Sequence, residues 1–530
     1  MEMLINAQRQ KEQKINTAWP DLLPTLANLA SHQDAECRFT GHELLLHLTD
    51  SIPGSLLDHT QSFFTMCQSG LSDKQVKVKE AALRSTSAFI VLLQKPEELK
   101  MFEQLIPGLM STLSIVLSNS DDPELAVGAI ESMVIIAESK PTFWRGNLES
   151  VWKAMVSLVG KDVEMINEDV QMMAMEFILG LAEQAGGMVR KRKDLIGEFA
   201  TALLQACAVL VEEDFDTWAN SKLESQFGDS SDDDELAICG EQSLDRFANS
   251  IGGNALFPQI MPKIEMALGS QDWKLRRAGL TALALITEGC QKIMKPMLPN
   301  LTQGVLQFTK DQHFRVRYAA LHCLGQFAMD FKGDFQNKCC KAVIPTLVNQ
   351  LNGADVCEKL KHCASKSLLV ICDGGVCREE LLLPHLQPAL EGLFQLVKQG
   401  KTKTKEDALT TISSITSVIG EKFEPYFNVF MPLAIDVLKL SATEENVNVR
   451  GRAVECIGFI GTSVGKERFA PFVKDVMAEF LRILNSPDDA EGRVGNEYLL
   501  QGCVRVCECL GADFVPYLQH ILPKIFIFYF

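Results

Sequence analysis

The chain has 530 residues, of which 47% are hydrophobic and 22% charged, and its formal net charge at pH 7 is −17. This composition can bury a large core, while the acidic balance disfavours binding to DNA or RNA, which needs a basic face. No run reaches the roughly 18 apolar residues that a membrane-spanning helix requires. Residues 1–16 also lack the apolar core of a secretion signal, so we expect a soluble intracellular protein.

A helix-start pattern returns along the chain at steps of about 40 to 47 residues. The pattern is an aliphatic residue, then Arg or Lys, then small residues, as in Val316-Arg317-Tyr318-Ala319-Ala320. With the basic position as anchor, the series runs Arg38, Lys79, Ala126, Gln171, Cys239, Arg276, Arg317, Lys361, Lys405, Arg450 and Arg493. Such a period is typical of arrays in which stacked helix pairs supply the core. The sequence therefore predicts an all-α, HEAT-repeat (armadillo-like) superhelical solenoid of about eleven helix pairs.

Each period is predicted to contain two helices joined by a short polar turn. The first helix often contains proline and has apolar residues at three- and four-residue spacing, as in residues 257–268 and 343–351. The second helix begins at the anchor and carries small side chains, such as Ala319 and Ala320, where neighbouring helices must approach closely. On this basis residues 1–210 form N-terminal HEAT repeats and residues 237–530 form central HEAT repeats.

The period breaks once, between Gln171 and Cys239, where residues 211–236 are predicted as an acidic insertion loop. Residues 211–235 contain ten acids and one lysine. Such a segment is often only a solvated loop, but large aromatic residues are unexpected in a loop that only solvates. The alternative is a movable contact for a basic partner, anchored by Asp214, Asp216 and Trp218. Its electrostatic attraction would come from Asp232, Asp233, Asp234 and Glu235.

A second acidic feature follows from the register of the repeats. An acid stands twelve or thirteen residues after six anchors, at Asp50, Glu138, Glu183, Glu288, Asp330 and Asp373. Equal register on stacked helices forms a stripe along one surface, although the helix dipole opposes an acid near a helix C-terminus by roughly 0.3 to 1 kcal/mol. The stripe is either a row of ordinary polar helix ends or an anionic lining for Lys/Arg-rich ligands.

Catalytic and metal-binding patterns are absent from the sequence. The sixteen cysteines include no Cys-x-x-Cys pair, and the nine histidines are dispersed. There is no Walker loop, no dinucleotide-binding glycine motif after a strand, no His-Glu-x-x-His and no Gly-x-Ser-x-Gly. We therefore expect buried reduced thiols, no metal, no cofactor and no enzymatic activity.

The chain resembles the importin-β superfamily, and closely its karyopherin beta-3 branch, which includes importin five. The resemblance spans nearly the whole chain. It rests on segments that include Glu212-Glu213-Asp214, Trp218-Ala219-Asn220, Gly240-Glu241-Gln242-Ser243-Leu244-Asp245-Arg246, Asp272-Trp273-Lys274, Arg315-Val316-Arg317-Tyr318-Ala319-Ala320 and Phe430-Met431-Pro432. Similarity to this family implies a nuclear transport receptor that carries basic cargo through Phe-Gly-lined pores and is unloaded by GTP-bound Ran. In relatives an acidic loop within the array touches Ran.

Two departures qualify the resemblance. Family members have about two further repeats before the position of Met1 and many after the position of Phe530, so the chain is expected to be a fragment or an altered gene product. The amino-terminal repeats of relatives form a principal Ran-binding surface. The match is also weak between Asp355 and Cys377, which makes Asp373 a less secure cargo contact than the other acids.

These observations together predict a nuclear import receptor that shuttles between cytoplasm and nucleus. Its expected partners are cargo proteins with Lys/Arg-rich import signals, GTP-bound Ran and Phe-Gly nucleoporins, without direct nucleic-acid binding or membrane insertion. The cargo contacts are predicted where the acidic register and the resemblance coincide, at Glu241, Asp245, Glu288 and Asp330. The alternative is a HEAT-repeat scaffold or adaptor outside nuclear transport.

Overall fold

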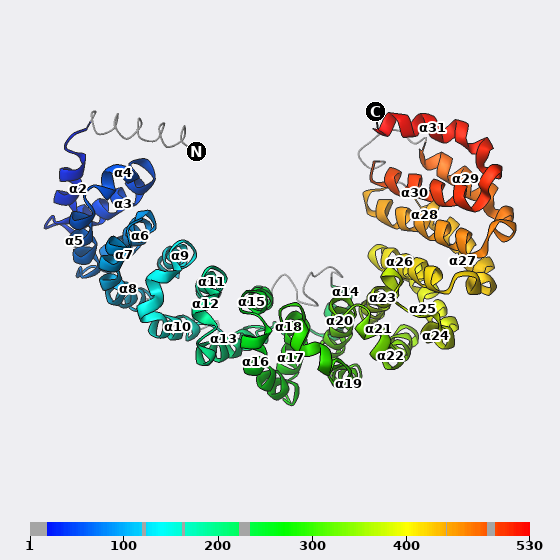
Figure 1. The fold of residues 1–530 in the computed structure, drawn as a ribbon, viewed down its shortest axis with the longest axis horizontal. Helices are drawn as coiled ribbons and strands as arrows, with labels where there is room; N and C mark the ends of the chain where they lie inside the picture. Colours follow the sequence, from blue (N-terminus) through cyan, green and yellow to red (C-terminus); the bar gives the residue numbers. More distant parts are fainter. Residues whose placement is uncertain are drawn as a thin grey trace. The chain divides into compact units, whose positions relative to one another are not determined.

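The structure is a computed structural model that describes residues 19–118, 123–161, 165–221, 234–440, 443–484 and 493–529. Every regular element in these ranges is a helix (Figure 1). The chain divides into two compact units. The first contains residues 1–210, 232–270 and 288–290, and the second contains residues 211–231, 271–287 and 291–530.

Helix pairs build the first unit. Its second helices, which carry the anchors, are α3 (Ala35–Ser51), α6 (Val76–Leu92), α9 (Pro123–Ser139), α11 (Glu168–Gln184) and α15 (Glu235–Ile251). They contact one another in chain order. The first helices are α2 (Leu22–Ala30), α5 (Thr60–Leu71), α8 (Ile106–Ser118), α10 (Leu148–Val156), α13 (Lys193–Ala206) and α16 (Gly253–Leu268). Short helices in the connections are α4 (Pro53–Leu57), α7 (Pro96–Phe102) and α12 (Gly186–Val189).

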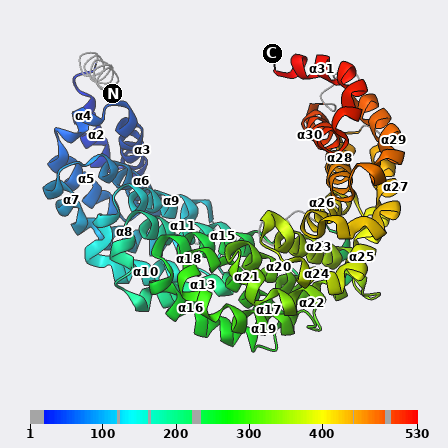
Figure 2. The same cartoon turned by 45° about the vertical axis from the view of Figure 1, so that its right-hand side comes forward.

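The second unit repeats the same plan. Its second helices are α17 (Trp273–Leu285), α20 (Phe314–Asp330), α23 (Glu358–Cys372), α26 (Thr402–Ile419), α28 (Glu444–Val464) and α30 (Arg493–Leu510), which follow one another side by side (Figure 2). The first helices are α19 (Leu298–Phe308), α22 (Cys340–Asn352), α25 (Leu386–Gln399), α27 (Phe427–Leu438), α29 (Lys466–Leu484) and α31 (Val515–Tyr529). Shorter helices are α14 (Phe215–Asn220), α18 (Thr287–Met294), α21 (Asp334–Lys338) and α24 (Glu379–Leu382). All eleven anchors lie in second helices, so the predicted all-α repeat fold is confirmed.

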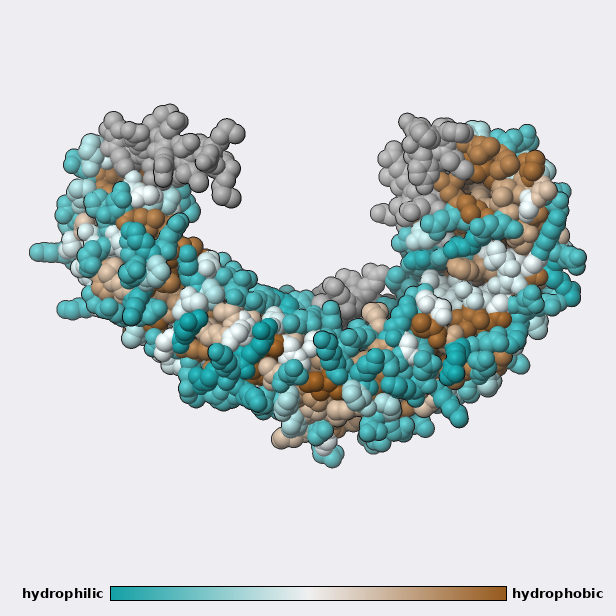
Figure 3. Space-filling model, viewed as in Figure 1, coloured by the Kyte–Doolittle hydropathy of each residue, from teal (hydrophilic) through white to brown (hydrophobic). Residues whose placement is uncertain are grey.

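The apolar faces of these helices form the core, and hydrophilic residues cover most of the visible surface of each unit (Figure 3). One segment of the described chain, Pro96–Ser118, is long and apolar enough to cross a membrane by length and composition alone. The structure breaks it into α7, a 3-10 turn at Glu103–Leu105 and α8. Phe102 is fully buried and stacks on Phe89 with ring centroids 5.4 Å apart. The segment therefore contributes to the core of a repeat.

Two of the basic anchors, Arg38 and Arg276, link one repeat to the next. The Arg38 Nε lies 2.6 Å from Asp73 Oδ2, and the Arg276 Nε lies 2.8 Å from Asp311 Oδ2. In both pairs a second guanidinium nitrogen donates to the other carboxylate oxygen. Each aspartate lies in the turn before the following second helix. The sequence pattern that marks a helix start thus also forms a contact between repeats.

We expect Asp311→Asn to destabilise the repeats around α17 and α20 by about 1 to 3 kcal/mol, because a charge-assisted bidentate contact is lost. Burial raises the pKa of Asp311, but hydrogen bonds from Arg276 and the His313 N–H outweigh it and leave the pKa below its ordinary value. The stability that ionised Asp311 contributes is therefore fully present above the pKa of Asp in the unfolded chain, about 3.9. This stability is lost as pH falls through the lower pKa of Asp311 in the folded protein.

Urea unfolding followed by circular dichroism at pH 7 and at lower pH checks this expectation. The difference between the two proteins should shrink as pH falls below about 4. Asp436→Asn is the matched control, because that side chain is 73% exposed. Equal midpoints for the Asp311 variant and the unsubstituted protein at pH 7 would show that the link contributes nothing to stability.

Candidate functional site

The acids predicted from the register lie where second helices end. Asp50, Glu138 and Glu183 lie in the last turns of α3, α9 and α11, Asp330 is the last residue of α20, and Asp373 follows α23. Glu288 lies in the first turn of α18. All six are exposed except Asp330, which is half-buried. The register therefore predicted solvent access for this row, but the surroundings differ from one acid to the next.

One acid of the row is neutralised within the first unit. Arg246 Nε lies 2.8 Å from Glu183 Oε1, and Arg246 Nη1 lies 2.7 Å from Glu176 Oε2. These two carboxylates raise the pKa of Arg246 above its ordinary value. Because Arg246 already pairs with Glu183, this acid is engaged within the fold and is a weaker candidate for a ligand contact.

The cargo contact predicted at Glu241 is not supported by the structure, because the side chain is fully buried. The neighbouring residue, Gly240, lies at a close approach of two helices. A Cβ at Gly240 would lie 3.0 Å from the Ala206 Cβ and 3.2 Å from the Cys207 nitrogen. Helix α15 therefore packs closely on the end of α13.

Two of the predicted cargo residues come together in the first unit. The Asn249 Nδ2 lies 3.4 Å from Asp245 Oδ1 and 3.4 Å from Glu288 Oε2. Asp245 is half-buried and Glu288 is exposed. A single amide thus holds two carboxylates near each other, which is an arrangement that can accept a Lys or Arg head group.

Asp330 lies in the second unit and has partners of its own. Its carboxylate accepts a hydrogen bond from Gln326 Nε2 at 2.8 Å and another from the Thr287 hydroxyl. These donors fix the carboxylate but leave it charged. Asp330 is therefore an oriented acceptor at the end of α20.

A cavity of 420 Å³ lies close to this position in the second unit. Its lining residues come from α20, α23, α26, α28 and the residues after α20 and α23, and they include Met329, Val370, Asp373, Arg452, Glu455 and Phe459. Arg452 pairs with Glu455 at 2.9 Å. The apolar walls suit the aliphatic stem of a basic side chain. Lys332 also lines the cavity, so two basic residues accompany the carboxylates of Asp373 and Glu455. Of this cavity, the sequence pattern indicated only Asp373.

The acidic insertion begins with a short helix. Asp214 caps α14, accepting hydrogen bonds from the Asp216 and Thr217 N–H groups at 2.9 Å. These bonds, led by that from Thr217, lower the pKa of Asp214. Asp214 and Asp216 are exposed, so both carboxylates remain accessible to a partner.

Trp218 does not serve as the exposed anchor that was predicted, because it is fully buried. Its ring lies 4.7 Å from the Phe314 ring and 5.9 Å from the Tyr318 ring, both on α20. The Lys359 Nζ lies 4.7 Å from the centre of the indole. Phe215 and Trp218 thus both pack on the second helix α20.

Basic residues at the starts of second helices hold the rest of residues 211–221, which we call the strap. Lys274 pairs with Glu212 at 3.1 Å, Lys359 donates to the Ser221 hydroxyl at 2.7 Å, and Lys401 donates to the Asn220 carbonyl at 3.1 Å. The strap therefore runs from α17 to α26 along the second unit. The prediction of a movable loop is wrong for these residues.

The remaining acids of the insertion have different settings. Asp232 and Asp233 lie outside the described residues. Asp234 is buried just before α15, and Glu235 is the exposed first residue of that helix. Burial makes Asp234 a poor source of long-range attraction, while Glu235 keeps the predicted exposure.

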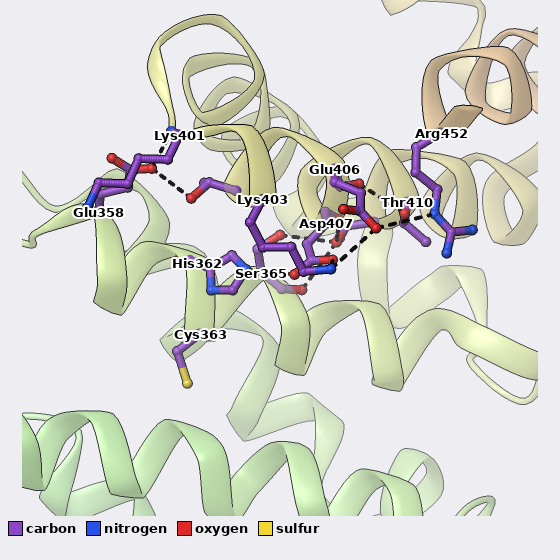
Figure 4. A network of polar contacts seen from close by, with 12 residues as sticks. Glu358, His362, Cys363, Ser365, Lys401, Lys403, Glu406, Asp407, Thr410 and Arg452 are labelled. Carbon is purple, nitrogen blue, oxygen red and sulfur yellow. Dashed lines mark hydrogen bonds and ion pairs between the residues drawn. The ribbon is translucent and has the colours of Figure 1, made fainter. Parts of the chain in front are cut away.

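A polar network next to the strap was not predicted from the sequence (Figure 4). His362 Nε2 lies 2.7 Å from Asp407 Oδ2, Lys403 lies 3.6 Å from Asp407 Oδ1, and Arg452 lies 3.9 Å from Glu406. Burial raises the pKa of Asp407, but His362 and Lys403 outweigh it and lower the pKa overall. The network joins α23, α26 and α28. Asp407 stands two residues after the anchor Lys405, a register signal that could have indicated it.

The sixteen cysteines are free thiols, and burial raises the pKa of Cys290 and Cys456 to about 12. Such thiols are poor nucleophiles at neutral pH. Within the described ranges, no group of three or more His, Cys, Asp or Glu residues is placed to hold a metal ion.

Comparisons with known families agree with this geometry along the chain. The family described as IPO5-like, TPR repeats matches residues 7–154, and an importin repeat matches residues 161–258. A HEAT-like repeat matches residues 273–327, and the family described as importin subunit beta-1-like, TPR repeats matches residues 383–525. Each of these models covers less than half of the chain, and each describes importin or HEAT-like repeats.

Curated relatives of this importin-like chain include importin subunit beta-3 of Saccharomyces cerevisiae, which is 26% identical over 96% of the chain and 46% of the relative. The probable importin-5 homolog of Dictyostelium discoideum is also 26% identical, with the same two shares. The chain spans about half the length of these relatives. The predicted resemblance to the karyopherin beta-3 branch is confirmed by these matches.

Solved structures of Kap121p have the same fold. Kap121p alone and Kap121p bound to Pho4p are each 25% identical to the chain, with a TM-score of 0.84 over 96% of the chain and 48% of the solved chain. Kap121p bound to Nup53p has the same identity and TM-score over 96% and 47%. Similar proteins of this fold thus bind other proteins.

Proposed function

We propose that the chain is a nuclear import receptor that binds Lys/Arg-rich import signals of cargo proteins and shuttles between cytoplasm and nucleus. The observation that carries the proposal is the set of accessible acids at or near the ends of second helices, with Asp245 and Glu288 held together and Asp373 lining a cavity of mixed polarity. The importin names of the relatives support the same role.

The binding chemistry is electrostatic and distributed. An exposed ion pair contributes only about 0 to 1 kcal/mol, and salt screens it over about 10 Å at 0.1 M. Several acids must therefore act together within each unit, Asp245 with Glu288 in the first and Asp330 with Asp373 in the second. The net charge of −17 also speeds the approach of basic cargo.

Release and passage need two further partners in this proposal, which are GTP-bound Ran and Phe-Gly nucleoporins. The accessible carboxylates of Asp214, Asp216 and Glu235 are the proposed contacts of the acidic insertion with Ran or with basic cargo. Because the strap is docked on the second unit, a partner would meet Asp214 and Asp216 on a fixed surface. We propose a receptor that acts by binding, without catalysis.

Retention on beads that carry Phe-Gly nucleoporin repeats tests the class of function. The chain should be retained at about 0.1 M salt, where exposed charges beyond the Debye length of about 10 Å are screened. Beads with Ser-Gly repeats of the same length are the control. Equal recovery from both beads would favour a scaffold or adaptor outside nuclear transport.

A further inference from the structure

The first unit contains a second cavity, of 710 Å³, at the connections between repeats. It lies between residues 142–148 and the segment that joins α11 to α13. Its lining includes Arg145, Leu148, Gln184, Met188, Lys191 and Arg192. This volume is within the range of about 300 to 1,000 Å³ that is usual for ligand sites.

The charge of this region is opposite to that of the chain. Residues 140–153 and 184–194 together contain seven basic and two acidic residues, a difference of +5 in a protein whose net charge is −17. Four of the basic residues are consecutive, at positions 190–193. Basic runs of this kind are often only solvated surface, so the contacts of each side chain decide what the run does.

Two members of the run have structural roles. Arg190 donates to the carbonyl oxygens of Ser250 and Ile251 at 2.7 and 3.0 Å. Arg192 lies 2.8 Å from Glu149 and 2.7 Å from Asp194, and these acids raise its pKa. Arg192 is thus held in place at the cavity, because Glu149 and Asp194 both pair with its guanidinium group.

Arg145 and Lys191 are different. Both line the cavity, both are exposed, and neither forms an ion pair with any other described residue. They stand on separate connections, one before α10 and one after α12, so the two charges approach the cavity from different segments. Leu148 and Met188 add apolar surface between them. The arrangement suits an anion with some apolar contact area.

The anion is more consistent with an acidic peptide than with a nucleic acid. A nucleic acid needs an extended basic track or aromatic platforms for its bases. The residues that line the cavity include no aromatic side chain. A few carboxylates on a short segment match one compact basic cavity.

We propose that this cavity is a docking site for an acidic segment of a protein partner, separate from the acidic surface that binds basic cargo. The partner's Asp or Glu carboxylates would pair with Arg145 and Lys191, next to the fixed Arg192. The site would let one receptor bind a basic and an acidic ligand at the same time. It adds to the proposed function and does not depend on it.

Fluorescence anisotropy with a labelled peptide of eight glutamates tests the proposal on the full chain. The double variant Arg145→Glu/Lys191→Glu should bind this probe at least about tenfold more weakly, which corresponds to about 1.4 kcal/mol. Lys74→Glu/Lys100→Glu is the matched control, because it makes the same charge change at two other exposed lysines of the first unit. It should change the affinity by less than about twofold, since distant surface charges are screened.

Three outcomes would overturn the proposal. The first is no binding of the glutamate peptide by the unsubstituted chain, and the second is an equal loss in both double variants, which would show only long-range charge. The third is a single-stranded oligonucleotide that binds more tightly than the peptide and shows the same dependence on Arg145 and Lys191. The Arg145→Glu/Lys191→Glu variant should bind a Lys-rich peptide as tightly as the unsubstituted chain does. A failure of the acidic-peptide proposal can therefore be told apart from a failure of the import proposal.

Discussion

Replacing Trp218 by alanine should destabilise the repeats around α20 and α23 by about 3 to 5 kcal/mol, the usual loss for a fully buried aromatic side chain. The substitution removes the ring contacts with Phe314 and Tyr318 and the cation–π contact with Lys359. The strap should then be held less firmly on the second unit, because the Phe215–Phe314 ring contact, a few hydrogen bonds and one ion pair would remain.

Native-state hydrogen exchange of α20 and α23 measures this effect, and limited proteolysis within residues 211–221 reports the release of the strap. Trp19→Ala is the matched control, since Trp19 is 51% exposed. Unchanged exchange in α20 and α23 would show that the strap does not support these helices. The sequence alone predicts that deletion of residues 214–234 leaves stability nearly intact. Because Trp218 is buried against α20, we now expect this deletion to destabilise the second unit.

Neutralising the accessible acids should weaken binding of a Lys-rich peptide about thirtyfold, if four pairs contribute about 0.5 kcal/mol each. The variant combines Asp245→Asn, Glu288→Gln, Asp330→Asn and Asp373→Asn. Its effect should decrease at high salt, because the lost contacts are screened electrostatic ones. Isothermal titration at low and high salt gives both quantities.

The control for this variant removes the same number of charges next to first helices. It combines four substitutions at exposed acids, which are Asp58→Asn, Glu97→Gln, Asp436→Asn and Asp513→Asn. Its affinity should stay within about twofold of the unsubstituted chain if the site is local. Similar losses in both variants would mean that net charge, and no particular surface, attracts the peptide.

Local sequence patterns predicted the repeats well because the anchors recur with the helix pairs themselves. The same register placed Glu138, Glu288 and Asp373 at exposed helix ends. It could not predict the burial of Glu241, which depends on tertiary packing. Spacing along one helix does not report how near its neighbour lies.

The insertion shows the other limit of sequence reasoning. Its composition predicts a solvated loop, since ten acids cannot form a core. Trp218 is nevertheless buried, because its partners Phe314 and Lys359 come from helices that lie far along the chain. Neither residue is unusual within its own repeat, so only the tertiary structure identifies the contact.

The central claim is that the chain binds a basic import signal and releases it to GTP-bound Ran. A pull-down of Ran locked in its GTP form, with and without a Lys-rich import-signal peptide, tests it most directly. The account predicts that the chain captures the peptide, that GTP-bound Ran displaces it, and that GDP-bound Ran does not. A peptide that never binds would contradict the account at its first step, and a peptide that stays bound in the presence of captured GTP-bound Ran would contradict it at the second.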